Sequence, residues 1–181
     1  MKPNWFVALP VPAPWLPALV ADLPESCRAF AAGDIHMTVA FLGAMDPARA
    51  PAVIEVIEAL PFRPVRVGLG EMLALPAPQR VSALSLAVGE GHEEAATLIG
   101  SCRESLWDVA GARHDERPPL PHVTVARPLR KFGQQGQREA LAWADRCQPP
   151  ADVSTLNGLA LYTWAEDRGR QQFRILYQRS V

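Results

Sequence analysis

The sequence contains His36-Met37-Thr38-Val39-Ala40-Phe41 and, 86 residues later, the related stretch His122-Val123-Thr124-Val125-Ala126-Arg127. Each stretch carries a His-x-Thr-x pattern in a mostly apolar segment. Residues i and i+2 of a β-strand point to the same side, so each copy would place an imidazole and a hydroxyl on one face. Two such strands lining one groove would surround a small anion with two imidazoles and two hydroxyls. This pattern predicts acid–base chemistry on a phosphate.

The repetition is hard to attribute to chance. The chain has four His and five Thr among its 181 residues, so a given His would have Thr two positions later about 3% of the time. Two of the four histidines show this spacing, and both copies also share Val and Ala at equivalent places. We therefore treat the two stretches as two halves of one composite site.

Strict alternation predicts which side chains share a face of each strand. The groove-lining residues would be His36, Thr38, Ala40, His122, Thr124 and Ala126. The residues packed against helices would be Met37, Val39, Phe41, Val123 and Val125. The same alternation directs Arg127 away from His122, unless the strand twists or ends before Pro128.

Two imidazoles on one groove suit in-line displacement at phosphorus. Histidine has an unperturbed pKa of about 6.5, so one member of a pair can be neutral while the other is protonated. The neutral one can deprotonate water, and the protonated one can protonate the departing oxygen. Thr38 and Thr124 can donate to the non-bridging oxygens, where negative charge builds in the transition state. Taken without further information, the symmetry leaves open whether His36 or His122 is the acid.

Other chemistries fit the sequence poorly. There is no His-x-x-x-His pattern, carboxylate cluster or cysteine pair near the histidines, so we expect no metal and no cofactor. No Ser lies on a Gly-x-Ser-x-Gly turn, and no phosphate-binding glycine loop of the nucleotide-binding folds is present. His92 is expected to be exposed. His114, in the loop before the second motif, is near enough to approach the groove but is expected to have no role in the site.

Charge is distributed unevenly along the chain. The net charge is −1, which excludes a strong overall field for nucleic acid, but residues 1–112 carry −5 and residues 113–181 carry +4. Six basic residues flank the second motif: Arg113, Arg117, Arg127, Arg130, Lys131 and Arg138. Local attraction of a phosphate to this half is therefore reasonable. Three scattered cysteines, an N-terminal segment interrupted by prolines and no membrane-length apolar stretch predict a cytoplasmic protein, which we expect to be a monomer.

The pattern of apolar residues and breakers predicts the order of elements. Strands are expected near residues 5–9, 35–42, 65–75, 81–88, 122–127, 153–162 and 172–178. Helices are expected near residues 14–31 (one helix or two short ones), 46–60, 90–110 and 134–147. This order is close to one β-α-β-α-β unit repeated. It predicts an α+β fold in one bilobal domain, residues 1–181, whose two pseudo-symmetric lobes each have a mainly antiparallel sheet with outer helices around a central groove.

The motifs resemble those of the two-histidine phosphoesterase superfamily. Within it, His36 to Gly43 and His122 to Pro128 are similar to the RNA 2′,3′-cyclic phosphodiesterases, also called 2′-5′ RNA ligases. The early Phe6-Val7-Ala8-Leu9 followed by Pro resembles that family's first strand, and the likeness extends over nearly the whole chain. Val39 and Val125 stand where members often have Leu.

This resemblance implies metal-independent hydrolysis of RNA 2′,3′-cyclic phosphodiester ends to 2′-phosphomonoesters, and implies reverse 2′-5′ ligation as a further activity. It assigns His36 as the proton donor to the leaving 3′ oxygen and His122 as the acceptor that activates water. It also assigns phosphate binding to Thr38, Thr124 and Arg127. The implied partners are RNA ends or nucleotides that bear a 2′,3′-cyclic phosphate.

Two alternatives remain open at this stage. One keeps the mechanism but changes the substrate to another cyclic or 2′-5′-linked nucleotide, and product analysis separates it from the first. The other is a non-catalytic module that binds RNA or nucleotides, which the modest overall charge makes less favourable.

Overall fold

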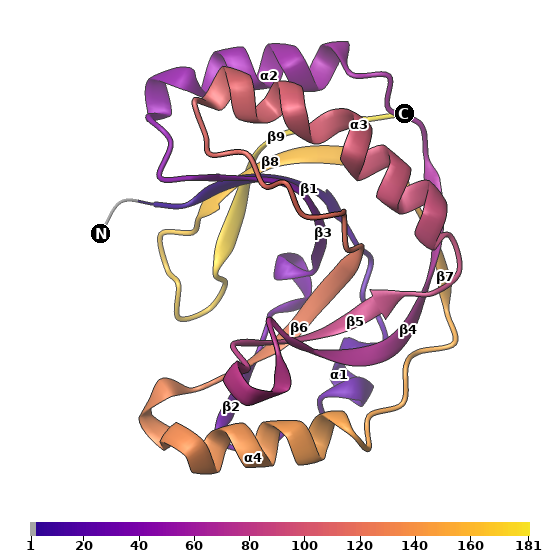
Figure 1. The fold of residues 1–181 in the computed structure, drawn as a ribbon, viewed down its shortest axis with the longest axis vertical. Helices are drawn as coiled ribbons and strands as arrows, with labels where there is room; N and C mark the ends of the chain where they lie inside the picture. Colours follow the sequence, from indigo (N-terminus) through magenta and orange to yellow (C-terminus); the bar gives the residue numbers. More distant parts are fainter. Residues whose placement is uncertain (1–2) are drawn as a thin grey trace.

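The structure is a computed structural model that describes residues 3–181, so the first two residues of the expected domain lie outside the described part. Within this range the chain forms a nine-stranded sheet flanked by four α-helices (Figure 1). The strands are β1 (Trp5–Pro10), β2 (Cys27–Ala29), β3 (His36–Gly43), β4 (Val65–Leu75), β5 (Ala83–Val88), β6 (His122–Pro128), β7 (Val153–Leu156), β8 (Gly158–Trp164) and β9 (Phe173–Ser180). The helices are α1 (Leu16–Leu19), α2 (Ala50–Ala59), α3 (His92–Ala110) and α4 (Gly133–Ala144).

The strand order divides the sheet into two related halves. It runs β7-β4-β5-β6-β3-β1-β8-β9, with β2 paired separately to β6, and every strand pairing found among residues 3–181 is antiparallel. The two motif strands, β6 and β3, therefore lie side by side at the centre of this order. Figure 1 shows α2 and α3 outside one half and α4 outside the other. The expected α+β fold with two pseudo-symmetric lobes is confirmed.

The most apolar strands lie inside the sheet. In β1 the side chains of Val7, Ala8 and Leu9 have no exposed surface, and β1 is paired on both edges, with β3 and with β8. A strand covered on both faces reads as a continuous apolar run instead of an alternating one. This is why residues 5–9 could be assigned to a buried strand from sequence alone.

Two predicted elements differ from the structure. Residues 14–31 were expected to be helical, but only α1 forms there, and the segment ends in β2, which pairs with β6. Pro17 and Pro24 disfavour a longer helix, because proline cannot continue a helix interior. Residues 27–29 pair instead with the edge of β6. The strand expected at 153–162 is two strands, because β7 pairs with β4 whereas β8 pairs with β1 in the other half of the sheet.

The helix expected near residues 46–60 is confirmed, and Asp46 caps its start. The Asp46 carboxylate accepts a hydrogen bond from the Ala48 N–H at 3.0 Å, a 3₁₀ turn follows, and α2 then begins at Ala50. This cap satisfies one of the amide groups that a helix start leaves unpaired. Among residues 3–181, no helix is long and apolar enough to cross a membrane.

Candidate active site

The two motifs meet around one pair of residues at the centre of the sheet. Met37 of β3 is the antiparallel partner of Val123 of β6. His36 and Thr38 flank Met37, just as His122 and Thr124 flank Val123, so an approximate twofold axis passes through the central pair. Both central side chains are fully buried, whereas the four flanking His and Thr side chains are partly accessible. The strand pairing thus brings the four predicted polar groups together.

A β-bulge follows the Thr of each motif. On β3, Ala40 is opposite Val7 and Thr38 is opposite Ala8, which leaves Val39 as an extra residue. On β6, Ala126 is opposite Leu84 and Thr124 is opposite Ser85, which leaves Val125 as the extra residue. One extra residue reverses the alternation of everything after it.

Because of the bulges, the residues after positions 39 and 125 lie on the opposite face of the strand from the one expected. Ala40 and Ala126 were expected to line the groove, but both are buried, with 1% and 0% of their surfaces exposed. Phe41 was expected in the core, yet 55% of its surface is exposed. Arg127, at the equivalent place on β6, is also exposed and shares the side of His122 and Thr124. The extra residue Val125 therefore turns Arg127 to the face of His122, which strict alternation did not predict.

Both motif histidines are held by the same hydrogen bond. Nδ1 of His36 donates to the carbonyl oxygen of Asp34, and Nδ1 of His122 donates to the carbonyl oxygen of Leu120, each at 2.6 Å. A carbonyl oxygen can only accept, so Nδ1 carries a proton in both rings and Nε2 is left for another partner. Each imidazole can then accept a proton at Nε2 when neutral or donate one when charged.

An aromatic enclosure distinguishes His36 from His122. The His36 ring stacks on Phe6 at 4.7 Å between centroids and contacts Tyr162 at 5.3 Å and the edge of Phe173 at 5.6 Å. Removal from water among these rings lowers the pKa of His36 to about 4, against an opposing effect of the Asp34 carbonyl. The positive charge of Arg127 lowers the pKa of His36 further, and the neighbouring His122 imidazole acts in the same direction. In the free protein His36 is therefore neutral near pH 7.

Asp34 connects this enclosure to the backbone that holds His36. Asp34 is 1% exposed, and its carboxylate accepts hydrogen bonds from the Gln172 N–H at 2.9 and 3.0 Å and from the Phe173 N–H at 2.9 Å. Its own carbonyl accepts the His36 bond. One residue thus ties the start of β9 to the first motif histidine. Asp34 lies two residues before His36 in the sequence, but only the fold reveals its partners.

The two threonines have different surroundings. The Thr124 hydroxyl is hydrogen-bonded to the Ser85 hydroxyl at 3.0 Å, and Ser85 is fully buried on β5. The residue of β1 opposite Thr38 is Ala8, which carries no hydroxyl. Ser85 was not singled out from the sequence, because only its register against β6 places it beside the motif.

The Arg127 guanidinium lies over the Phe30 ring, 5.3 Å from its centroid. Partial burial lowers the pKa of this guanidinium, and the positive charge of Arg168 lowers it further. Arg168 belongs to the loop between β8 and β9, so residues from both lobes contribute positive charge beside the motif.

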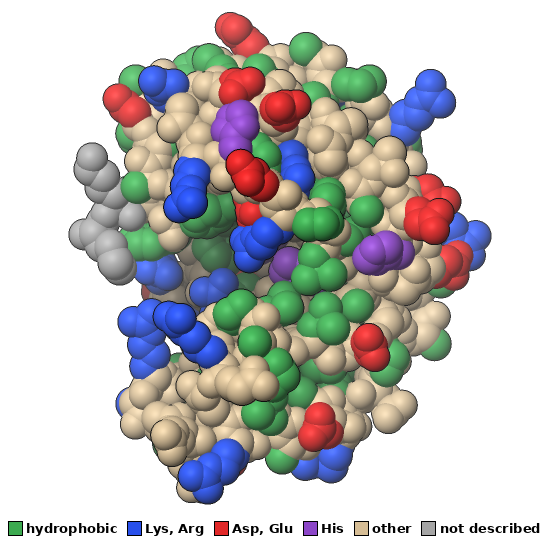
Figure 2. Space-filling model, in the orientation of Figure 1, with side chains coloured by type: hydrophobic (Ala, Val, Ile, Leu, Met, Phe, Trp, Pro, Cys, Tyr) green, Lys and Arg blue, Asp and Glu red, His purple; other side chains and the backbone are tan. Residues whose placement is uncertain are grey.

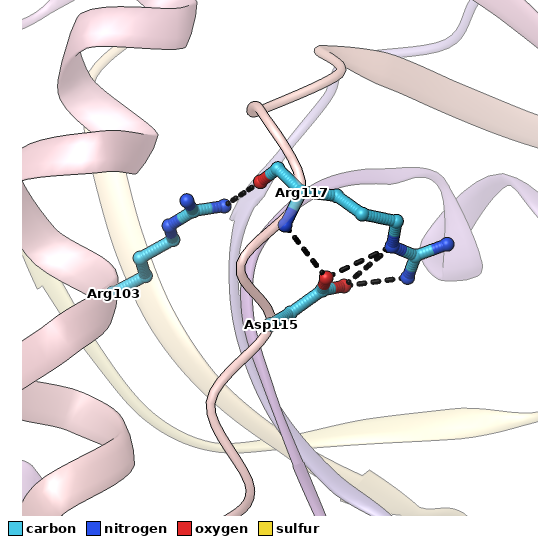
Figure 3. Close-up of polar contacts among 3 residues, drawn as sticks. All are labelled: Arg103, Asp115 and Arg117. Carbon is cyan, nitrogen blue, oxygen red and sulfur yellow. Dashed lines mark hydrogen bonds and ion pairs between the residues drawn. The ribbon is translucent and has the colours of Figure 1, made fainter.

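The segment before β6 is anchored to α3. Arg103 of α3 donates to the Arg117 carbonyl oxygen at 2.9 Å, and the Arg117 guanidinium binds the Asp115 carboxylate (Figure 3). This ion pair holds the pKa of Asp115 at about 2. His114 binds Asp108 of α3 at 2.9 Å, so it is directed to the helix and not to the motif. These contacts fix the path of the chain into Leu120 and His122.

Among the described residues, no group of three or more His, Cys, Asp or Glu side chains is placed to hold a metal ion. What the arrangement can do follows from its own side chains: two imidazoles with available Nε2 atoms, two hydroxyls and an arginine on one surface. Such a set can bind an oxyanion and move protons on either side of it.

Comparison with known proteins identifies the fold. No family model and no curated protein matches the chain. Solved structures do match: LigT of Escherichia coli with bound 3′-AMP is 20% identical, with a TM-score of 0.72 over 99% of both chains. A protein described as a phosphoesterase is 19% identical, with a TM-score of 0.73 over 100% of this chain and 99% of that one. TT0787 of Thermus thermophilus is 18% identical, with a TM-score of 0.69 over 98% and 97% of the two chains. The chain has the fold of these proteins.

Proposed function

We propose that this protein, as one bilobal domain, hydrolyses the 2′,3′-cyclic phosphodiester at RNA ends to a 2′-phosphomonoester without a metal ion. The observation that carries the proposal is the matched pair of histidines, His36 and His122, on neighbouring strands. Each has its Nδ1 bound to a carbonyl, its Nε2 available and a threonine two residues later. The shared fold with LigT and with a phosphoesterase supports the same chemistry.

The proposed reaction transfers two protons and exchanges one bond at phosphorus. Nε2 of His122 takes a proton from water as the water oxygen bonds to phosphorus. The bond between phosphorus and the 3′ oxygen breaks, and that oxygen takes a proton from Nε2 of His36. The products are a 2′-phosphomonoester and a 3′-hydroxyl, and the net reactant is one water molecule. When the 5′-hydroxyl of a second strand takes the place of water, the same proton transfers join it to the phosphorus as the 3′ oxygen leaves, and the resulting 2′-5′ phosphodiester is the basis for ligation.

His36 must be protonated before it can donate, although its pKa is about 4 in the free protein. A bound phosphodiester places a negative charge beside the imidazole, and an opposite charge within a few ångströms favours the protonated form. In this scheme the substrate itself raises the pKa of His36. The enclosure also excludes water, which strengthens that interaction.

Thr38, Thr124 and Arg127 are proposed to hold the phosphate. Hydroxyl and guanidinium donors are suited to non-bridging oxygens, and their interaction strengthens as negative charge develops there. The bulge at Val125 puts Arg127 on the side of His122, which the proposal requires.

The substrate is proposed to carry a nucleoside. LigT has been solved with 3′-AMP, with ATP and with NADP⁺. Another cyclic or 2′-5′-linked nucleotide remains the alternative substrate, because the proton transfers are the same.

The test is hydrolysis of a 2′,3′-cyclic nucleotide by the protein and its variants. His36→Ala and His122→Ala are each expected to lower kcat by at least about 10²-fold. His114→Ala is the matched control, because that ring binds Asp108 away from the motif, and it should retain full activity. EDTA should leave the rate unchanged. Near-normal activity of either motif variant would contradict the proposal, as would loss of activity in EDTA that an added metal restores.

A further inference from the structure

Three arginines from three separate segments gather around Arg127, just after the second motif. Arg28 of β2 is the direct cross-strand partner of Arg127 on β6, so the two side chains leave the sheet on the same side. Arg168 comes from the loop between β8 and β9, and its charge acts on Arg127. In Figure 2, Lys and Arg side chains surround a hollow at the left of the molecule, where Figure 1 places this loop.

Each of the three guanidiniums contacts an uncharged group, either a backbone carbonyl or an aromatic ring. Arg28 donates to the carbonyl oxygens of Arg168 and Gly169, at 2.7 and 3.0 Å. Arg168 lies over the Trp164 ring, 4.0 Å from its centroid, and Arg127 lies over Phe30. Within residues 3–181, the arginines that form ion pairs are others, namely Arg66, Arg117 and Arg174.

Like charges on directly opposed strands are destabilising. The protein nevertheless holds this cluster in place with carbonyl hydrogen bonds and aromatic rings, neither of which neutralises it. A cyclic phosphodiester carries one negative charge. In the proposed function, Arg127 and the motif side chains already bind that charge. The positive charge of Arg28 and Arg168 is therefore in excess of what the reacting phosphate requires.

We propose that Arg28 and Arg168 form a second phosphate subsite, which binds the phosphodiester 5′ of the terminal nucleotide. This inference rests on the proposed function and deepens it: the preferred substrate is the end of an RNA strand, not a free cyclic mononucleotide. Arg28 also tethers the loop that carries Arg168, so one side chain both binds and shapes the subsite. Single-stranded RNA is the ligand class because its successive phosphates are single negative charges along one backbone.

The experiment compares two substrates with the same terminal base: adenosine 2′,3′-cyclic monophosphate and a trinucleotide RNA that ends in the same cyclic phosphate. The wild-type protein should show a higher kcat/KM on the trinucleotide. Arg168→Gln should lower kcat/KM on the trinucleotide by about tenfold and leave the mononucleotide nearly unchanged. The salt dependence on the trinucleotide should become shallower, by about 0.7 in log–log slope for one lost contact. Arg174→Gln is the matched control, because that arginine lies on the same hairpin but is paired with Glu166.

Equal kcat/KM on the two substrates, or an equal loss on both in Arg168→Gln, would overturn the second subsite while the proposed function stands. If the wild-type protein hydrolyses neither substrate, the proposed function fails instead. In that case binding of a trinucleotide ending in a 2′-phosphate, followed by fluorescence anisotropy, still decides the subsite. Weaker binding by Arg168→Gln than by Arg174→Gln supports it, and equal binding contradicts it.

Discussion

Val39 and Val125 are the extra residues of equivalent β-bulges, one in each motif strand. Both are buried, and each reverses the alternation of its strand just after the motif threonine. The bulge at Val125 places Arg127 on the same side of β6 as His122 and Thr124, and the bulge at Val39 exposes Phe41 in the corresponding position. The approximate symmetry of the site therefore extends to the two β-bulges. The side chains that the bulges expose differ, because Phe41 is aromatic and Arg127 is charged.

Arg127→Ala is expected to raise KM for a 2′,3′-cyclic nucleotide by about tenfold, because a guanidinium on the phosphate side of the strand is lost. Arg127→Lys keeps the charge but loses the planar guanidinium, so its KM should lie between those of Arg127→Ala and the wild type. Steady-state kinetics measure both. Wild-type KM and kcat in Arg127→Ala would show that the bulge does not bring this side chain to the substrate.

Binding of a phosphate anion is expected to raise the pKa of His36. The ring should titrate at about 4 in the free protein, where the rings of Phe6, Tyr162 and Phe173 enclose it, and higher when a 2′-phosphomononucleotide is bound. NMR of the imidazole CH signals during a pH titration measures both values. An unchanged pKa on binding would mean that His36 stays neutral, which fits a base and would exchange the proposed roles of His36 and His122.

His36 is also expected to make the protein less stable in acid. Its folded-state pKa of about 4 lies below the unfolded value of 6.5, so the unfolded chain binds the proton more readily between these values. The free energy of unfolding should fall as pH drops from about 6.5 to 4, by on the order of 3 kcal/mol at most.

Denaturant unfolding at several pH values tests this effect. His36→Phe should lose less stability across the same interval, whatever its stability at pH 7. The Asp115–Arg117 pair does not obscure the comparison, because its contribution to stability is lost as pH falls from the ordinary Asp pKa of 3.8 to about 2, and both proteins contain it. Equal pH dependence in the two proteins would contradict the enclosure as the cause.

Asp34 is expected to act as a positioning residue. Asp34→Ala leaves the buried N–H groups of Gln172 and Phe173 without acceptors, which should lower the free energy of unfolding by about 2–4 kcal/mol. Asp34→Asn keeps one oxygen and should be milder. Both should loosen Phe173 from the His36 ring, so the pKa of His36 should rise toward 6.5. A stability loss without that rise would limit Asp34 to a purely structural role.

Much of this arrangement follows from local sequence. The apolar run of β1, the breakers between elements and the His-x-Thr repeats are local patterns, and they predicted the α+β fold and the gathering of four polar groups. The bulges are different, because an extra residue is defined only against the partner strand, β1 or β5. The aromatic enclosure of His36 likewise depends on side chains from three strands, β1, β8 and β9, which are distant in sequence. Strand β2 forms by pairing with β6, which its own sequence does not reveal.

The position of the phosphate in the product tests the central proposal most directly. An RNA ending in a 2′,3′-cyclic phosphate should be incubated with the protein in EDTA, and the product analysed by ³¹P NMR against 2′- and 3′-phosphate standards. We expect a 2′-phosphomonoester with a free 3′-hydroxyl, formed at least about 10²-fold more slowly by His36→Ala or His122→Ala. A 3′-phosphomonoester, or no hydrolysis by the wild-type protein, would contradict it.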